Sequence, residues 1–118
     1  MTQTGQTARA YERTDSDATS FEPFIVGGQA IGEVHWLRAE GSDGRTLAAG
    51  LWRAEPMSFP YPFANDETIH VLEGQLEVKL EDGETLNLGP GDLVSFTKGT
   101  NSTWTVKTPF KKFFIVSG

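Results

Sequence analysis

The residue best suited to chemistry in this sequence is a single carboxylic acid. Glu67 lies in a segment where Ile69 and Val71 fall on its side of an extended strand, so we expect its carboxyl group to point inward among aliphatic neighbours. We find no Arg or metal position beside it, and an acid in such a surrounding is suited to general acid–base catalysis. The competing interpretation is an acid that only hydrogen-bonds to a neighbouring group and stabilises the fold.

Two aromatic runs flank this acid in the sequence. Phe59, Tyr61 and Phe63 alternate with prolines, which cannot donate ladder hydrogen bonds, so this run is expected to form an edge or irregular strand with its three rings on one face. A later run places Ser102 and Trp104 together on one face of another strand. These rings either fill the interior of a small barrel or form the wall of a ligand pocket.

The histidines and cysteines give little support for metal or nucleophilic chemistry. His35 and His70 are the two histidines of the chain, and His70 points to the opposite face of the strand from Glu67. His35 belongs to a separate predicted strand, residues 32–39, and we expect each histidine to have a surface or interface role. There is no cysteine, which excludes disulfides, thiolate metal sites and cysteine nucleophiles.

Charge narrows the class of partner. The 118 residues include 10 Lys and Arg against 16 Asp and Glu, a net charge of −6, and such an acidic chain is repelled by nucleic acid and anionic lipid. The apolar stretches are far shorter than the ~20 residues of a membrane span, so we expect a cytoplasmic protein with no membrane or nucleic-acid partner. We expect Lys107, Lys111 and Lys112 to lie at a solvated strand edge, with an anion-recognising rim as the alternative.

Short strands and turns account for most of the chain. Residues 1–20 are rich in Thr, Ser, Gln and charge, and we expect a polar N-terminal arm that a neighbouring subunit could hold. Residues 21–118 alternate apolar runs with Gly and Asp turns and lack helical periodicity, which predicts one all-β domain. A three-residue loop at 81–83 would pair Val78 with Leu86, whereas a two-residue turn would place the apolar residues of the two strands on opposite faces.

The central part of the chain resembles the cupin family. Glu67 and Gly74 reproduce the end of the first cupin motif, and Gly91 and Gly99 match two glycines of the second. The similarity is closer to the small cupins of the ethanolamine-utilisation and ureidoglycine-aminohydrolase type, whose outline is echoed by Gly50-Leu-Trp52, Pro56, Val71-Leu-Glu-Gly74, Gly91-Asp92, Trp104 and Lys111-Lys112. The resemblance implies a cupin double-stranded β-helix, which is a jelly-roll barrel. Small cupins of this kind are commonly dimers.

The sequence departs from the family pattern where metal-binding cupins hold their metal. Counting back from Glu67, the two histidine positions of the first motif hold Tyr61 and Phe63 in one spacing and a proline at both positions in the other. The histidine of the second motif falls on Ser102. Only the acid of the four usual ligands remains, and a lone carboxylate does not hold a transition metal against water, so we expect no metal and no other cofactor.

Three classes of function stay open. The first is binding of a small organic molecule in an aromatic-lined pocket formed by Phe59, Tyr61, Phe63, Glu67, Ser102 and Trp104. Aromatic faces beside a carboxylate favour a ligand with an apolar or cationic body. The second is a metal-independent isomerase, lyase or cyclase that uses Glu67 and Tyr61 as acid and base, and the third is a metal-dependent enzyme with unusual ligands such as Glu67 and His35. Apolar residues before Gly50, together with the family resemblance, lead us to expect a homodimer.

Overall fold

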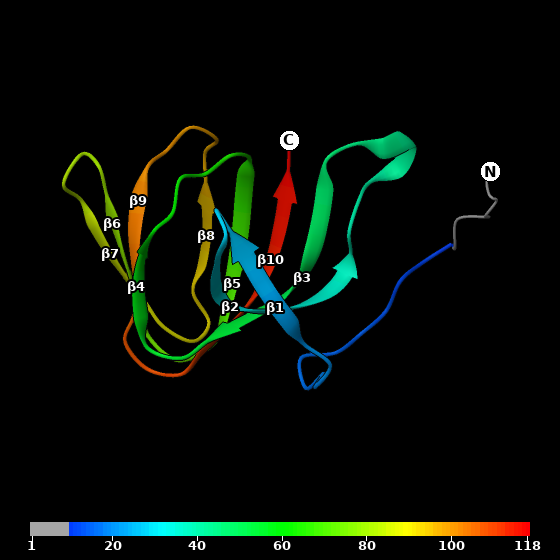
Figure 1. The fold of residues 1–118 in the computed structure, drawn as a ribbon, viewed down its shortest axis with the longest axis horizontal. Coiled ribbons are helices and arrows are strands. Elements are labelled where there is room, and N and C mark those ends of the chain that lie inside the picture. Colours follow the sequence, from blue (N-terminus) through cyan, green and yellow to red (C-terminus); the bar gives the residue numbers. More distant parts are fainter. Residues whose placement is uncertain (1–9) are drawn as a thin grey trace.

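The computed structural model describes residues 10–118, and strands make up most of that part of the chain (Figure 1). One short 3-10 turn, Ser42–Gly44, is the helical element of residues 10–118. The strands are β1 (Glu22–Val26), β2 (Gln29–Arg38), β3 (Leu47–Ala54), β4 (Met57–Pro60), β5 (Asp66–Glu73), β6 (Leu76–Leu80), β7 (Thr85–Leu88), β8 (Leu93–Phe96), β9 (Ser102–Val106) and β10 (Phe110–Ser117). The prediction of an all-β fold is confirmed.

These strands form two antiparallel sheets that face each other. The larger has the order β1-β2-β3-β10-β5-β8 and the smaller the order β4-β9-β6-β7. In Figure 1 the smaller sheet stands at the left and the larger at the right. From β4 onward the chain passes back and forth between the sheets, which is the connectivity of a jelly roll.

The alternation of side chains along each strand places the core between the sheets. In β5 the side chains of Glu67, Ile69 and Val71 are buried, while Thr68 is exposed. Gly74 follows this strand with a φ of 85°, and a Cβ there would lie 2.2 Å from the Pro109 carbonyl oxygen, so only glycine fits. The glycine that ends the first motif is therefore required by the close approach of two backbone segments.

The predicted hairpin register is confirmed. Val78 of β6 pairs with Leu86 of β7, and residues 81–83 form the three-residue loop between the strands. Gly83 adopts a φ of 99°, the left-handed conformation that such a loop favours at its last position. This register places the apolar residues of both strands on the core face.

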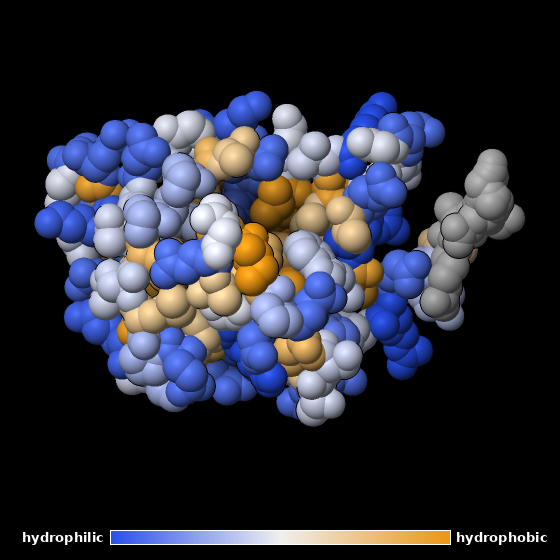
Figure 2. Space-filling model, in the orientation of Figure 1, coloured by the Kyte–Doolittle hydropathy of each residue, from blue (hydrophilic) through white to orange (hydrophobic). Residues whose placement is uncertain are grey.

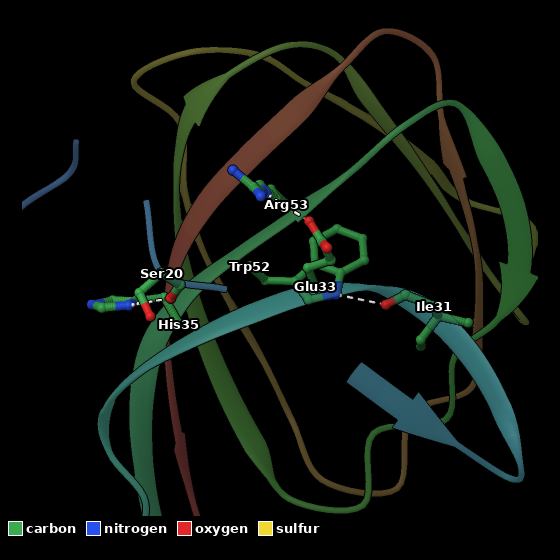
Figure 3. Close-up of polar contacts among 6 residues, drawn as sticks. All are labelled: Ser20, Ile31, Glu33, His35, Trp52 and Arg53. Carbon is green, nitrogen blue, oxygen red and sulfur yellow. Dashed lines mark hydrogen bonds and ion pairs between the residues drawn. The ribbon is translucent and has the colours of Figure 1, made fainter. Parts of the chain in front are cut away.

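Polar contacts, one buried and one on the surface, join the first strands to the rest of the larger sheet (Figure 3). Trp52 Nε1 donates a hydrogen bond of 2.9 Å to the carbonyl oxygen of Ile31, which joins β3 to β2. Arg53 Nε contacts Glu33 Oε1 at 2.8 Å on the surface. Both pairs link neighbouring strands of the larger sheet.

The segment before β1 lies against the same barrel. His35 Nδ1 donates to the carbonyl oxygen of Ser20 at 2.7 Å (Figure 3), and its Nε2 is 2.8 Å from Thr14 Oγ1. Residues 10–20 contain no strand or helix. The boundary at residue 20 between the predicted arm and the barrel domain stays a prediction. Residues 1–9 of the arm lie outside the described residues. No helix within residues 10–118 has the length and apolar character needed to cross a membrane.

Candidate functional site

A cavity of about 230 Å³ lies between the two sheets. Its wall is mostly aromatic and aliphatic, with contributions from both sheets, and it includes Trp52, Phe59, Tyr61, Glu67, Trp104 and Lys112. Trp36, which is 37% exposed, also lines it, so the cavity reaches the surface there. Figure 2 shows hydrophobic side chains gathered around a hollow near the middle of this face.

Three polar side chains meet at the cavity wall. Glu67 Oε1 accepts a hydrogen bond of 2.8 Å from the Tyr61 hydroxyl, and Glu67 Oε2 accepts one of 2.7 Å from Lys112 Nζ. Glu67 and Lys112 are each 3% exposed. The carboxylate thus has one neutral donor and one cationic donor inside an apolar surrounding, an arrangement in which each hydrogen bond is strong.

Local structure explains how each of these side chains reaches the site. Glu67 and Lys112 occupy inward positions of β5 and β10, two neighbouring strands of the larger sheet. Tyr61 follows the edge strand β4, and its backbone N–H donates to the Ser102 carbonyl at 2.8 Å. The Ser102 hydroxyl donates in return to the Tyr61 carbonyl at 2.7 Å. This pair of bonds continues the β4–β9 pairing past Pro60 and holds the tyrosine toward Glu67.

The Lys112 ammonium lies among aromatic rings. Nζ is 4.4 Å from the ring centre of Trp104, 5.2 Å from Trp52 and 5.5 Å from Phe114. These distances are within the range of cation–π attraction, which strengthens when the cation is removed from water. The aromatic wall therefore already surrounds a cation that belongs to the protein.

Burial shifts the protonation of two of these groups in ways that bear on chemistry. The pKa of Lys112 is lowered because burial disfavours the ammonium, and the neighbouring Glu67 carboxylate opposes that shift. The pKa of Tyr61 is raised, mainly by burial and further by the charge of Glu67 and the hydrogen bond to it. Tyr61 therefore remains a hydrogen-bond donor to Glu67 at neutral pH, and Lys112 is the group whose charged form burial disfavours.

The structure corrects the prediction for Lys112 and the premise that Glu67 has no cationic partner. Lys112 is buried, not at a solvated edge, because Phe110, Lys112 and Phe114 alternate on the inner face of β10. The same alternation is present in the sequence, and it predicts that Lys112 faces the core together with Phe110 and Phe114. Lys107 is exposed and is 3.3 Å from Glu77, as expected of a surface lysine.

The six side chains predicted to bind a ligand divide into two groups. Phe59, Tyr61, Glu67 and Trp104 line the cavity, whereas Phe63 and Ser102 do not. Phe63 instead stacks on Phe96 with ring centres 4.5 Å apart, and Ser102 uses its hydroxyl on the backbone. The ligand-binding roles of all six residues stay predictions.

One polar atom in the core lacks a partner. Trp104 Nε1 is fully buried and makes no hydrogen bond within the described part of the chain. A buried indole N–H without an acceptor costs about 1–3 kcal/mol. The Trp104 ring lines the cavity, but its Nε1 is closed off from it.

The site does not have the donor set of a metal centre. Among residues 10–118 no three His, Asp or Glu side chains are grouped so as to hold an ion. His35 is bonded to Ser20 and Thr14, and His70 lies half-buried on the opposite side of β5 from Glu67. Neither histidine lines the cavity.

A protein-family model matches most of this domain. The model of the EutQ-like cupin domain matches residues 41–114, which include β3 to β9 and the start of β10. The chain belongs to the EutQ-like cupin family. Its resemblance to the small cupins of the ethanolamine-utilisation type is therefore confirmed.

The relatives of this EutQ-like cupin include longer proteins. A curated relative from Escherichia coli K12, named acetate kinase EutQ, is 33% identical over 75 residues, which cover 64% of this chain and 32% of that protein. The chain thus spans about a third of the length of the curated relatives it matches.

Solved structures agree with the cupin fold. A putative ethanolamine utilization protein Q from Salmonella typhimurium LT2 superposes with a TM-score of 0.64 at 25% identity, covering 83% of this chain and 94% of that one. A DUF861 family protein from Thermotoga maritima has a TM-score of 0.53 at 38% identity, covering 54% of this chain and 73% of that one. The predicted jelly-roll barrel is confirmed.

Proposed function

We propose that this EutQ-like cupin binds a small organic molecule in the cavity around Glu67. The observation that carries the proposal is the combination of an aromatic cavity of about 230 Å³ with three polar groups on its wall. An apolar cavity of about 150 Å³ is large enough for benzene, so this one has room for a substituted ring or a branched chain of similar size. Such a site, mostly apolar with a few convergent polar groups, is typical of ligand pockets.

The electrostatics of the wall narrow the class of ligand. Lys112 neutralises Glu67 and already lies against the aromatic faces, so the reason to expect a cationic ligand is removed. The mostly aromatic and aliphatic wall still favours a ligand with an apolar body. The donor groups of two lining residues, Tyr61 and Lys112, favour a molecule that also carries a hydrogen-bond acceptor, such as a carbonyl or hydroxyl oxygen.

Thermal-shift measurements test the proposal directly. Small neutral ring compounds with one carbonyl or hydroxyl group should raise the melting temperature, whereas quaternary ammonium ions and small polyanions should not. The variant Ala48→Leu fills part of the cavity wall and should lose the shift. Ala64→Leu, at an exposed position outside the cavity, is the matched control and should keep it. If no compound in the first group stabilises the protein, or if Ala48→Leu responds like the control, the proposal is wrong.

A metal-independent isomerase, lyase or cyclase is the second candidate. The 2.8 Å hydrogen bond from the Tyr61 hydroxyl to Glu67 favours it, because it joins an acid and a potential donor at the cavity wall. Glu67→Gln separates the two candidates. A folded Gln variant that binds the ligand as wild type does but loses turnover would support the enzyme, and one with unchanged turnover would exclude it.

The proposal includes a homodimer in the cytoplasm. Ile25 and Val26 of the edge strand β1 are 57% and 39% exposed, and an exposed apolar edge strand favours pairing with a second copy. Val34, one of the apolar residues before Gly50, is buried in the core and does not contribute to this surface. The activity in the name of the curated relatives belongs to chains of which this one matches about a third, and the cavity alone does not assign it here.

A further inference from the structure

We propose that Lys112 captures a small aldehyde or ketone in the cavity as a Schiff base. The inference rests on the proposed ligand site and names the chemical class of its ligand. Lys112 lines the cavity, and its Nζ has one hydrogen-bond acceptor in the described structure, Glu67 Oε2 at 2.7 Å. An amine nitrogen on the wall of an apolar cavity is placed to meet a carbonyl carbon inside it.

Burial of Lys112 shifts its nitrogen toward the neutral, nucleophilic form relative to a solvated lysine, and Glu67 opposes only part of that shift. The ammonium has three N–H donors but only one acceptor here, and aromatic rings occupy the other sides at 4.4 to 5.5 Å. Burial lowers the pKa of Lys112, and Glu67 can accept the proton without moving because their atoms are already in hydrogen-bond contact. A lysine desolvated in an apolar pocket is one of the ways proteins activate an amine.

The reaction conserves atoms and needs no oxidant or reductant. Lys112 passes one proton to Glu67, and its nitrogen lone pair forms a bond to the carbonyl carbon while the C=O π electrons move to oxygen. That oxygen takes the proton from Glu67, and the nitrogen returns a second proton to the carboxylate. The C–O bond of this carbinolamine then breaks, and the hydroxyl leaves as water with the proton from Glu67. The product is a protonated imine paired with the Glu67 carboxylate.

The other lysines near the C-terminal strand lack this environment. Lys111 points to the outer side of β10, where Nζ contacts Glu73 at 3.1 Å and the Ser16 carbonyl at 2.7 Å. Lys107 is exposed and paired with Glu77. Lys107 is therefore solvated, and Lys111, whose side chain is 15% exposed, is paired on the side of β10 away from the cavity. Lys111 serves as an internal reference for a paired lysine outside the cavity, one residue away in the sequence.

The test is reductive trapping on the full chain with benzaldehyde and cyanoborohydride near neutral pH, read by intact mass and peptide mapping. Selective desolvation of the amine predicts modification of Lys112 at least about tenfold faster than Lys111. Lys112→Arg keeps a cation beside Glu67 but cannot form an imine, so its fast adduct should disappear. Lys111→Arg should retain the fast adduct at Lys112.

In wild type, excess benzyl alcohol, which fits the same cavity but has no carbonyl, should slow the labelling of Lys112 and leave that of Lys111 unchanged.

The outcomes separate this inference from the ligand site on which it rests. If benzyl alcohol raises the melting temperature but Lys112 is labelled no faster than Lys111, the Schiff base is excluded and the ligand site stands. If neither compound raises the melting temperature and benzyl alcohol does not slow the labelling of Lys112, both proposals fail. If Lys112→Arg does not fold, the competition experiment on wild type decides the question by itself.

Discussion

Lys112 Nζ and Glu67 Oε2 form an ion pair of 2.7 Å in the interior of the barrel, where each side chain is 4% exposed. Each group balances the charge of the other in a place where neither could stay charged alone. The pair therefore keeps the cavity wall neutral while holding a carboxylate and an amine in contact inside the barrel.

The first prediction concerns the stability of this pair. Lys112→Met should lower the free energy of unfolding by about 3–5 kcal/mol, because it leaves the Glu67 carboxylate buried without a counter-charge. Adding Glu67→Gln should recover part of that loss, since the double variant buries no net charge. Urea unfolding of wild type, both single variants and the double variant measures the cycle. A double variant less stable than Lys112→Met would contradict the interpretation.

Its control is an exposed pair near the same strand. Lys107 contacts Glu77 at 3.3 Å, and their side chains are 52% and 30% exposed. Lys107→Met should therefore change the free energy of unfolding by only about 0–1 kcal/mol.

The second prediction concerns Tyr61 and alkaline pH. The pKa of Tyr61 is raised in the folded protein, so above about pH 10 the unfolded chain loses the phenol proton while the folded chain keeps it. The stabilisation from Tyr61 is complete below that pH and is lost above it. Tyr61→Phe should cost about 1–3 kcal/mol near pH 8 by removing a donor from Glu67, and the difference from wild type should shrink above about pH 10.

Unfolding in urea at several pH values measures this difference. Ser58→Ala removes an exposed hydroxyl that is 3.1 Å from Thr105 Oγ1 and should keep the alkaline slope of wild type. A constant difference between wild type and Tyr61→Phe across the alkaline range would show that Tyr61 does not titrate differently in the two states.

The third prediction concerns metal content. After dialysis against a chelator, the protein should contain no stoichiometric Mn, Fe, Ni, Cu or Zn by elemental analysis. Glu67 is already paired with Lys112, and a divalent ion beside it would be repelled by that ammonium. A stoichiometric metal that disappears in both Glu67→Gln and His35→Ala would instead support a metal enzyme with unusual ligands.

The fourth prediction concerns assembly. Light scattering should give twice the chain mass of 12.9 kDa at micromolar concentration. Ile25→Glu on the exposed edge strand β1 should shift the protein toward monomer, because it places a charge in the predicted interface. Leu93→Glu, on the opposite edge strand β8, is the control and should leave the dimer intact. A monomer mass for wild type removes the prediction.

The sequence by itself determined the class of fold and much of its register. Alternating apolar residues and glycine turns specify strands locally, and the parity of Val78 and Leu86 allowed only one hairpin loop. The same alternation placed Glu67 on the core side of β5. These features depend on residues close together in the chain, so the order of residue types along the sequence is enough to predict them.

The partner of Glu67 was decided only by the tertiary structure. Lys112 is 45 residues away in sequence, and it reaches the carboxylate because β10 inserts between β3 and β5 in the larger sheet. The period of two in β10 shows that Lys112 faces inward, but strand order determines what it meets there. Strand order depends on how the whole chain buries its apolar surface, so no local pattern could assign this ion pair or the cavity beside it.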